Sequence, residues 1–350
     1  MAGDYKKKNE TKTDYKSLLR ELKDKGPERL YTLWGEEDYL LGNFFNDIKN
    51  ACLGDGGEDF NHHRLEGEKL DIQKLSQAVD TVPFFGERTL IEVRNFDVNA
   101  CLEDMTERLK PVISDIPDYA TLVFLLPTGC KPDGRRAGIK LLKSLGRGIE
   151  FTTQPQDALV NWIGRRFAAH NKKISIEDCK KLIFISGDHM QTLIPEIEKI
   201  AGYVKSDVVC GEDIQRLAQR IPEASVFDMT DCIAAKNYDG ALGILAELLQ
   251  TNEPPVKILA MIGYQMRKLY SARVAIDSGL KADYLVKSCG FNAVFQAERF
   301  MRSARGFSKK CLAKDVELCT IADYRMKSSS EEDENILSEL LLRMALGEAQ

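Results

Sequence analysis

The loop after the first predicted strand is where this chain could be expected to bind phosphate. In many nucleotide-binding α/β proteins this loop reads G-x-x-x-x-G-K-[ST], and its backbone N–H groups surround the phosphates. Here the corresponding sequence is WGEEDYLLGN. Gly35 is present, but Gly42 follows seven residues later instead of five, and the dipeptide Gly-Lys occurs nowhere in the chain. The loop therefore lacks the lysine that would reach a nucleotide.

Three carboxylates follow Gly35 at the start of the next predicted helix. Glu36, Glu37 and Asp38 would satisfy the positive end of the helix dipole themselves and repel a phosphate. Glu92 lies inside a later predicted strand, without the Asp-Glu pair that would complete a metal-binding acid site. We interpret residues 35–38 as a degenerate nucleotide site. The alternative, that the scaffold was never a nucleotide-binding one, stays open on these features.

Metal and redox chemistry have little support in the sequence. The nine cysteines are scattered singly from Cys52 to Cys319 without a C-x-x-C pair, which favours free thiols in a reducing cytosol. Of the four histidines only His62 and His63 are neighbours, and adjacent residues of a strand point to opposite faces. No carboxylate cluster suited to two metal ions is evident, so nucleotidyl transfer is not expected. We predict no metal and no cofactor.

Two adjacent aromatic residues occupy an unusual place in the stretch VDTVPFFGERTLIEV, residues 79–93. Phe84 and Phe85 stand between a proline and a glycine, just before a predicted strand. Most paired aromatics lie in a core, and the residues alone favour that interpretation. Exposed instead, each ring could contribute roughly 1.5–3 kcal/mol in the pocket of a partner.

A basic cluster follows the fourth predicted strand. Its members surround a single acid, Asp133, and are Lys131, Arg135, Arg136, Lys140, Lys143 and Arg147. A solvated helix face is one interpretation, and contact of Arg135, Arg136, Lys140 and Lys143 with nucleic-acid phosphates is the other. The net charge of −5 gives no overall basic field, so the sequence does not decide between them.

These residues are carried by elements that alternate between strand and helix in the first part of the chain. The apolar runs predict strands near residues 30–34, 60–65, 89–93, 120–126 and 149–151. Helical periodicity lies between them, which predicts a parallel sheet covered on both faces. From residue 157 onward we find helical periodicity only.

The 350 residues, 43% hydrophobic and 29% charged, predict several domains. We expect a Lys-rich, partly helical segment over residues 1–27 and an α/β domain over 28–153. A small helical domain over 154–219 and a larger one over 220–350 complete the organisation. The polar start resembles no signal peptide, and no apolar run is long enough for a membrane span.

Several stretches together resemble the delta subunits of bacterial DNA polymerase III. They are LYTLWGEEDYLL, VPFFGERTLIEV and ATLVFLLP, then the helical WIGRRFAAHNKKISIEDCKKLIF and FDMTDCIAAKNYDGALGILAELL segments, and DYRMKSSS near the end. Each motif alone is weak, whereas their order over residues 28–345 is specific. In this family the last of these motifs starts the final helix.

The resemblance implies an AAA+-like α/β domain, a small helical lid domain and a helical collar that mediates oligomerisation. It implies binding and opening of the ring-shaped sliding clamp (beta), with no working nucleotide loop. The clamp contact would fall on Phe84 and Phe85, supported by Val82. The implied partners are the gamma/tau and delta prime subunits of a hetero-pentamer and primed DNA, in a cytoplasmic replisome at the nucleoid. The apolar segment 258–270 would then pack against partner subunits.

Two other functions stay open on the sequence. The chain could be a divergent AAA+ ATPase that still binds nucleotide, or a DNA-binding adaptor without a clamp partner. The missing Gly-Lys pair predicts no saturable ATP binding, and direct binding to a sliding clamp distinguishes the delta-subunit function from the adaptor.

Overall fold

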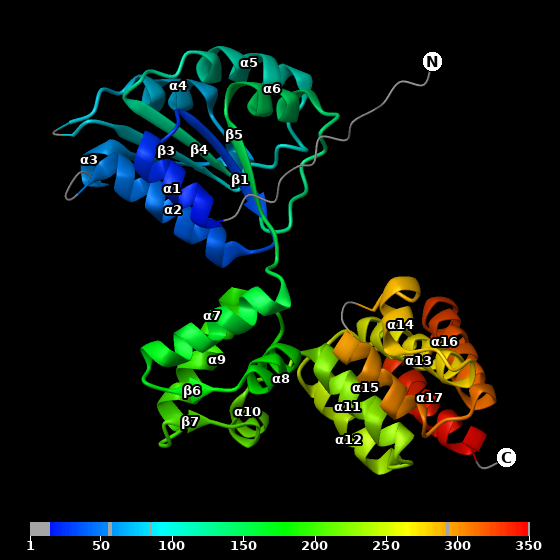
Figure 1. Cartoon of the computed structure of the whole chain (residues 1–350). Helices are drawn as coiled ribbons and strands as arrows, with labels where there is room; N and C mark the ends of the chain where they lie inside the picture. Colours follow the sequence, from blue (N-terminus) through cyan, green and yellow to red (C-terminus); the bar gives the residue numbers. More distant parts are fainter. Residues whose placement is uncertain (1–14, 55–57, 85, 292–293, 349–350) are drawn as a thin grey trace, which may run out of the picture. The chain divides into compact units, whose positions relative to one another are not determined.

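The computed structural model describes residues 15–54, 58–84, 86–291 and 294–348 (Figure 1). The chain divides into two compact units. The first unit consists of Met1–Ile176 and Asp188–Ala201, and the second of Glu177–Gly187 and Gly202–Gln350. The borders that we predict at residues 153 and 219 do not coincide with this division. The three-part domain organisation therefore stays a prediction.

The first unit contains a five-stranded sheet in the order β2-β3-β4-β1-β5, with every pair of neighbouring strands parallel. The strands are β1 Leu30–Gly35, β2 His62–Glu66, β3 Thr89–Arg94, β4 Ala120–Leu125 and β5 Arg147–Phe151. In the central pairing Leu30 lies opposite Leu122, and on the other side of β1 Tyr31 lies opposite Arg147. The predicted parallel sheet is confirmed.

Helices cover both faces of this sheet (Figure 1). α1 Tyr15–Lys25 and α2 Asp38–Leu53 lie on one face, and α4 Ile72–Asp80, α5 Glu103–Ser114 and α6 Ala137–Leu145 on the other. Leu30 and Trp34 of β1 pack into the core beneath α4, α5 and α6. Tyr31, with the opposite orientation, lies 6.2 Å from the Phe44 ring of α2. Burial on both faces explains why the strands read as continuous apolar runs.

The two features of functional interest lie at opposite edges of the sheet. Gly35 ends β1, so the loop with Glu36 and Glu37 leaves the carboxyl edge. Residues 81–88 connect α4 to the start of β3 in the chain, and the described ones among them, 81–84 and 86–88, lie at the amino edge. We call residues 81–88 the apolar bend.

Short elements complete the first unit and begin the second. The first unit also contains α3 Glu58–Asn61, the 3-10 helix Gly67–Lys69, α7 Gln156–Ala169, β6 Lys173–Ile174 and α9 Met190–Tyr203 up to Ala201. The second contains most of α8 Ile176–Ser186, β7 Val208–Val209 and α10 Gly211–Leu217. The strands β6 and β7 are missing from the prediction because two residues give no readable periodicity.

The rest of the second unit is a helical assembly around one apolar core. Its helices are α11 Pro222–Ala234, α12 Tyr238–Gln250, α13 Pro255–Asp277, α14 Ala282–Ser288, α15 Val294–Ala304, α16 Lys309–Ser328 and α17 Asp333–Glu348. In α13, Ile258, Ile262 and Met266 are completely buried in this core. The expectation that the apolar segment 258–270 faces partner subunits is therefore wrong for these side chains, because their own unit covers them.

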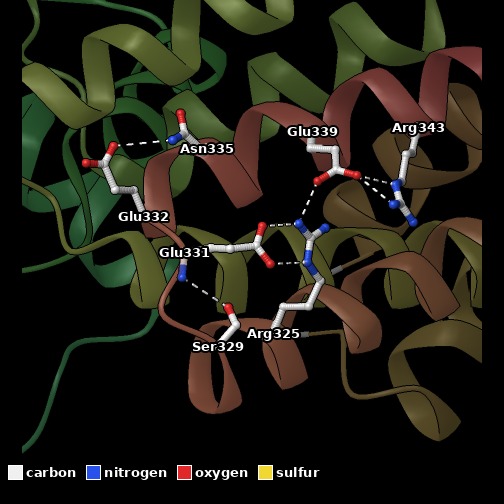
Figure 2. Close-up of polar contacts among 7 residues, drawn as sticks. All are labelled: Arg325, Ser329, Glu331, Glu332, Asn335, Glu339 and Arg343. Carbon is white, nitrogen blue, oxygen red and sulfur yellow. Dashed lines mark hydrogen bonds and ion pairs between the residues drawn. The ribbon is translucent and has the colours of Figure 1, made fainter.

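Charged side chains fix the turn between α16 and α17 (Figure 2). Arg325 pairs with Glu331 and with Glu339, and Glu339 also accepts from Arg343 Nε at 2.7 Å. The motif DYRMKSSS lies at the end of α16 and in the turn, since α17 begins only at Asp333. The expectation that this motif starts the last helix is wrong.

No helix among the residues described here is both long and apolar enough to cross a membrane.

Candidate functional site

The loop after β1 uses its own amide groups. The backbone N–H groups of Glu36 and Glu37 both donate to the Phe151 carbonyl, at 2.9 and 3.0 Å. These are the groups that would point at a phosphate in an open loop. Gly35 has φ +142°, and a Cβ there would lie 2.0 Å from the same carbonyl oxygen. Glycine is required because β5 approaches so closely.

The carboxylates of the loop are also engaged. Glu36 pairs with Lys131 at 2.9 Å, and Asp38 accepts from the Thr128 hydroxyl at 3.1 Å. Glu37 is completely buried and accepts from the Met190 backbone N–H at 3.2 Å. Its Oε1 has no hydrogen-bond partner among the described residues, and burial raises the pKa of this carboxyl. The predicted degenerate nucleotide site is thus a closed, acidic loop.

Glu92 on β3 is a completely buried carboxylate with polar partners on both of its oxygens. Its Oε2 lies 2.9 Å from His62 Nε2 on the neighbouring strand β2, and Arg94 pairs with the other oxygen. Burial alone would raise the pKa of Glu92, but the hydrogen bonds from His62 and Arg94 outweigh it, and the pKa is lowered. This carboxylate therefore stabilises the β2–β3 pair and has its oxygens occupied.

The apolar bend presents large apolar side chains to solvent. Val82 is 69% exposed and Phe84 is 54% exposed. α4 ends at Asp80, so both residues lie beyond the helix. At the base of the bend the Thr89 hydroxyl donates to the Thr81 carbonyl at 3.0 Å. Phe85, the other residue of the predicted pair, lies outside the described residues.

Two residues of this surface had no signal in the sequence. Phe60, at the end of α3, is 63% exposed, and its ring centroid lies 5.5 Å from that of Phe84. Its neighbour Asn61 is only 2% exposed and forms two hydrogen bonds with the Phe84 backbone. The two segments are 23 residues apart, and no periodicity links them.

Some side chains of the basic cluster form ion pairs within the chain. Lys131 pairs with Glu36, Arg147 pairs with Glu21, and Arg135 pairs with Asp133 at 3.0 Å. Lys143 lies 5.9 Å from the centre of the Trp34 ring.

Arg136 and Lys140 are exposed and make no side-chain ion pair with any described residue. Of the four residues predicted to contact phosphates, Arg135 pairs with Asp133 and Lys143 lies near the Trp34 ring, whereas Arg136 and Lys140 are not engaged in either way.

The described residues contain no group of three or more His, Cys, Asp or Glu side chains that could hold a metal ion. All nine cysteines are free thiols.

Comparison with known proteins gives matches over most of the chain. The model "DNA polymerase III, delta subunit" matches residues 31–152, and "DNA polymerase III delta subunit, C-terminal domain" matches residues 223–344. The DNA polymerase III subunit delta of Bacillus subtilis is 24% identical over 334 residues, covering 93% of this chain and 96% of that protein. The probable DNA polymerase III subunit delta of Aquifex aeolicus is 21% identical, covering 81% and 82%.

Among solved structures, the Bacillus subtilis DNA clamp loader delta protein matches with a TM-score of 0.52 and 23% identity, covering 95% of this chain and 99% of that one. This likeness confirms the predicted fold class of a parallel α/β sheet combined with many helices. The two family models together span more than half of the chain, and both describe the same subunit. The chain belongs to the DNA polymerase III delta subunit family.

Proposed function

We propose that this chain is the clamp-loader subunit that binds the ring-shaped sliding clamp and opens it for loading onto primed DNA. The contact is made by the apolar bend through Val82, Phe84 and Phe85. The observation that carries this proposal is the exposure of Val82 and Phe84 on a bend pinned at its base. Exposed aromatic and aliphatic side chains on a stiff support are typical anchors of protein interfaces.

The chain performs this function without hydrolysing ATP. The backbone N–H groups of Glu36 and Glu37 both donate to the Phe151 carbonyl, so neither is available to bind a phosphate at this loop. A divergent ATPase would need this loop to open and its acids to move. The polymerase activity of the holoenzyme is then carried by other subunits.

The partners are the clamp, the gamma/tau and delta prime subunits of a hetero-pentamer, and primed DNA, in the cytoplasm at the nucleoid. Arg136 and Lys140 support phosphate contact, because both are exposed and have no ion pair among the described residues.

Direct binding of the full chain to the sliding clamp of the same organism tests the contact. We expect saturable binding by the wild type and none by the Phe84→Ala, Phe85→Ala double variant, with an unchanged circular dichroism spectrum. Leu102→Ala is the matched control, since Leu102 is 71% exposed in the same unit. Wild-type protein that fails to bind the clamp would refute the proposal, and DNA binding without clamp binding would favour the adaptor.

A nucleotide titration tests the second part. We expect no saturable binding of Mg-ATP by the isolated chain. Saturable binding that is lost when Gly35 or Glu37 is replaced would show a working nucleotide site.

A further inference from the structure

We propose that Asn61 is the positioning residue of the clamp contact and that Phe60 is a further anchor within it. This inference rests on the proposed function, because it assigns two more residues to the surface that meets the sliding clamp. Neither residue lies in the apolar bend itself. Both come from the end of α3, just ahead of β2.

Asn61 forms two hydrogen bonds with the backbone of a single residue of the bend, Phe84. Its Nδ2 donates to the Phe84 carbonyl at 2.9 Å, and its Oδ1 accepts from the Phe84 backbone N–H at 2.7 Å. The amide side chain thus pairs with Phe84 much as a neighbouring strand would. Only an amide of this length offers a donor and an acceptor in that arrangement.

The fit around Asn61 is tight. A Cβ at Gly86 would lie 2.9 Å from Asn61 Nδ2, so glycine at this place lets the chain close over the side chain. Asn61 is 2% exposed, which removes water as a competitor for both hydrogen bonds. With Thr89 bonded to Thr81 at the base, the bend is fixed at the base and near the tip.

Phe60 has the opposite environment from its neighbour. It is 63% exposed, and its ring lies against Phe84 with a centroid distance of 5.5 Å and an interplanar angle of 52°. Phe60 and Phe84 therefore form a pair of rings that stands in solvent. A partner that receives Phe84 in an apolar pocket necessarily meets Phe60 at its rim or inside it, because the two rings are in contact.

The sliding clamp is the occupant to which this inference commits. The reason is continuity: Phe60 directly extends the surface that Phe84 offers, and it does so on the same edge of the sheet. Phe60 enlarges the apolar contact without adding a flexible segment, because its neighbour Asn61 is hydrogen-bonded to the Phe84 backbone.

The test for Phe60 is clamp binding by the full-length Phe60→Ala variant, compared with Leu102→Ala. Loss of the exposed part of the ring should weaken Kd about tenfold or more. Leu102→Ala should bind like the wild type. Equal affinities for Phe60→Ala and wild type would overturn the role of Phe60.

The test for Asn61 is a double-mutant cycle with Phe84. Asn61→Ala should weaken Kd about tenfold, and in the Phe84→Ala background the same change should have little further effect. Such non-additivity is expected only if Asn61 acts by holding Phe84. Two effects that multiply would overturn the positioning role and leave Asn61 as a general structural residue.

Asn99→Ala is the matched control for the loss of an asparagine side chain that is hydrogen-bonded to the backbone of another segment. Asn99 also donates to a main-chain carbonyl and accepts from a main-chain N–H, at Lys131 and Asp133, but on a different loop. We expect unchanged clamp affinity for Asn99→Ala. Hydrogen exchange gives a second measurement. The Phe84 backbone N–H should exchange faster in Asn61→Ala than in wild type, and an unchanged rate would contradict the hydrogen bonds between Asn61 and Phe84.

Failure of this inference is separable from failure of the proposed function. If the wild type binds the clamp, Phe84→Ala weakens binding, and Phe60→Ala and Asn61→Ala do not, only the inference falls. If the wild type does not bind the clamp, both fall.

Discussion

Replacing Phe84 with alanine should weaken clamp binding strongly and destabilise the fold less than the loss of a core phenylalanine does. A phenylalanine buries about 150–250 Å² when it is enclosed. Because Phe84 is 54% exposed, about 110 Å² is left for a partner to cover, worth up to about 2.7 kcal/mol at about 25 cal/mol per Å². That free energy corresponds to a Kd weakened by as much as about 100-fold.

The effect on folding should be smaller than for a phenylalanine of the core. In the free chain Phe84→Ala loses the contact with the Phe60 ring and the other contacts of the covered part of the side chain. An aromatic pair contributes about 0.5–1.5 kcal/mol beyond area burial, whereas a phenylalanine removed from a core costs about 3–5 kcal/mol. About 90 Å² of the ring is already covered in the free chain, so the free energy of unfolding of Phe84→Ala should fall by about 2 kcal/mol, less than a core phenylalanine loses.

Two assays on the same preparations decide between these effects. Calorimetric titration with the sliding clamp gives Kd, and urea denaturation gives the free energy of unfolding. Phe45→Ala serves as the contrast, since Phe45 is buried at 6% exposure and belongs to the core of the same unit. If Phe84→Ala loses 3 kcal/mol or more of stability, or if it binds the clamp like the wild type, the interpretation of Phe84 as an exposed anchor is wrong.

The loop after β1 and the basic cluster allow three further tests. Gly35→Ala should lower the free energy of unfolding by about 2–4 kcal/mol in urea, because its Cβ would strike the β5 backbone; Gly42→Ala, with open space around it, should not. Glu37→Gln should raise the melting temperature at pH 8, because a raised pKa means that the ionised form opposes folding above that pKa. This gain should vanish at pH 4, and a gain independent of pH would contradict the cause. In the assembled loader, Arg136→Ala with Lys140→Ala should reduce the salt slope of DNA binding by about 2, and an unchanged slope would leave both as solvent-facing charges.

The sequence predicts the sheet well for a physical reason. Parallel strands buried on both faces need unbroken apolar runs, and TLIEV and ATLVFLL provide them. The helices between them carry apolar stripes, as in α2 with Leu40, Phe44 and Ile48. The lack of a phosphate-binding sequence in the loop at Gly35 can also be recognised, because the absence of a lysine at a fixed spacing is a local property of the sequence.

Features that depend on tertiary contacts cannot be predicted from the sequence in the same way. The helix that ends in DYRMKSSS could not be placed from its motif, because the turn depends on Arg325 reaching Glu331 and Glu339 (Figure 2). The apolar face of α13 predicts burial, but not which helices provide it. Asn61 bonds to a backbone 23 residues away, and its side chain has no periodic signature. The exposure of Val82 and Phe84 likewise follows from the end of α4 at Asp80 rather than from their type.

The positions of the closed loop and the apolar bend at opposite edges of one sheet have an evolutionary consequence. Substitutions that fill the carboxyl edge of β1 leave the entry to β3 unchanged, since β4 separates these two strands. Selection can therefore act on reaction chemistry and on recognition as independent traits within a single domain. The same separation makes the fold a practical scaffold for engineering: the apolar bend can be redesigned for a new partner while the loop after Gly35 stays bonded to Phe151.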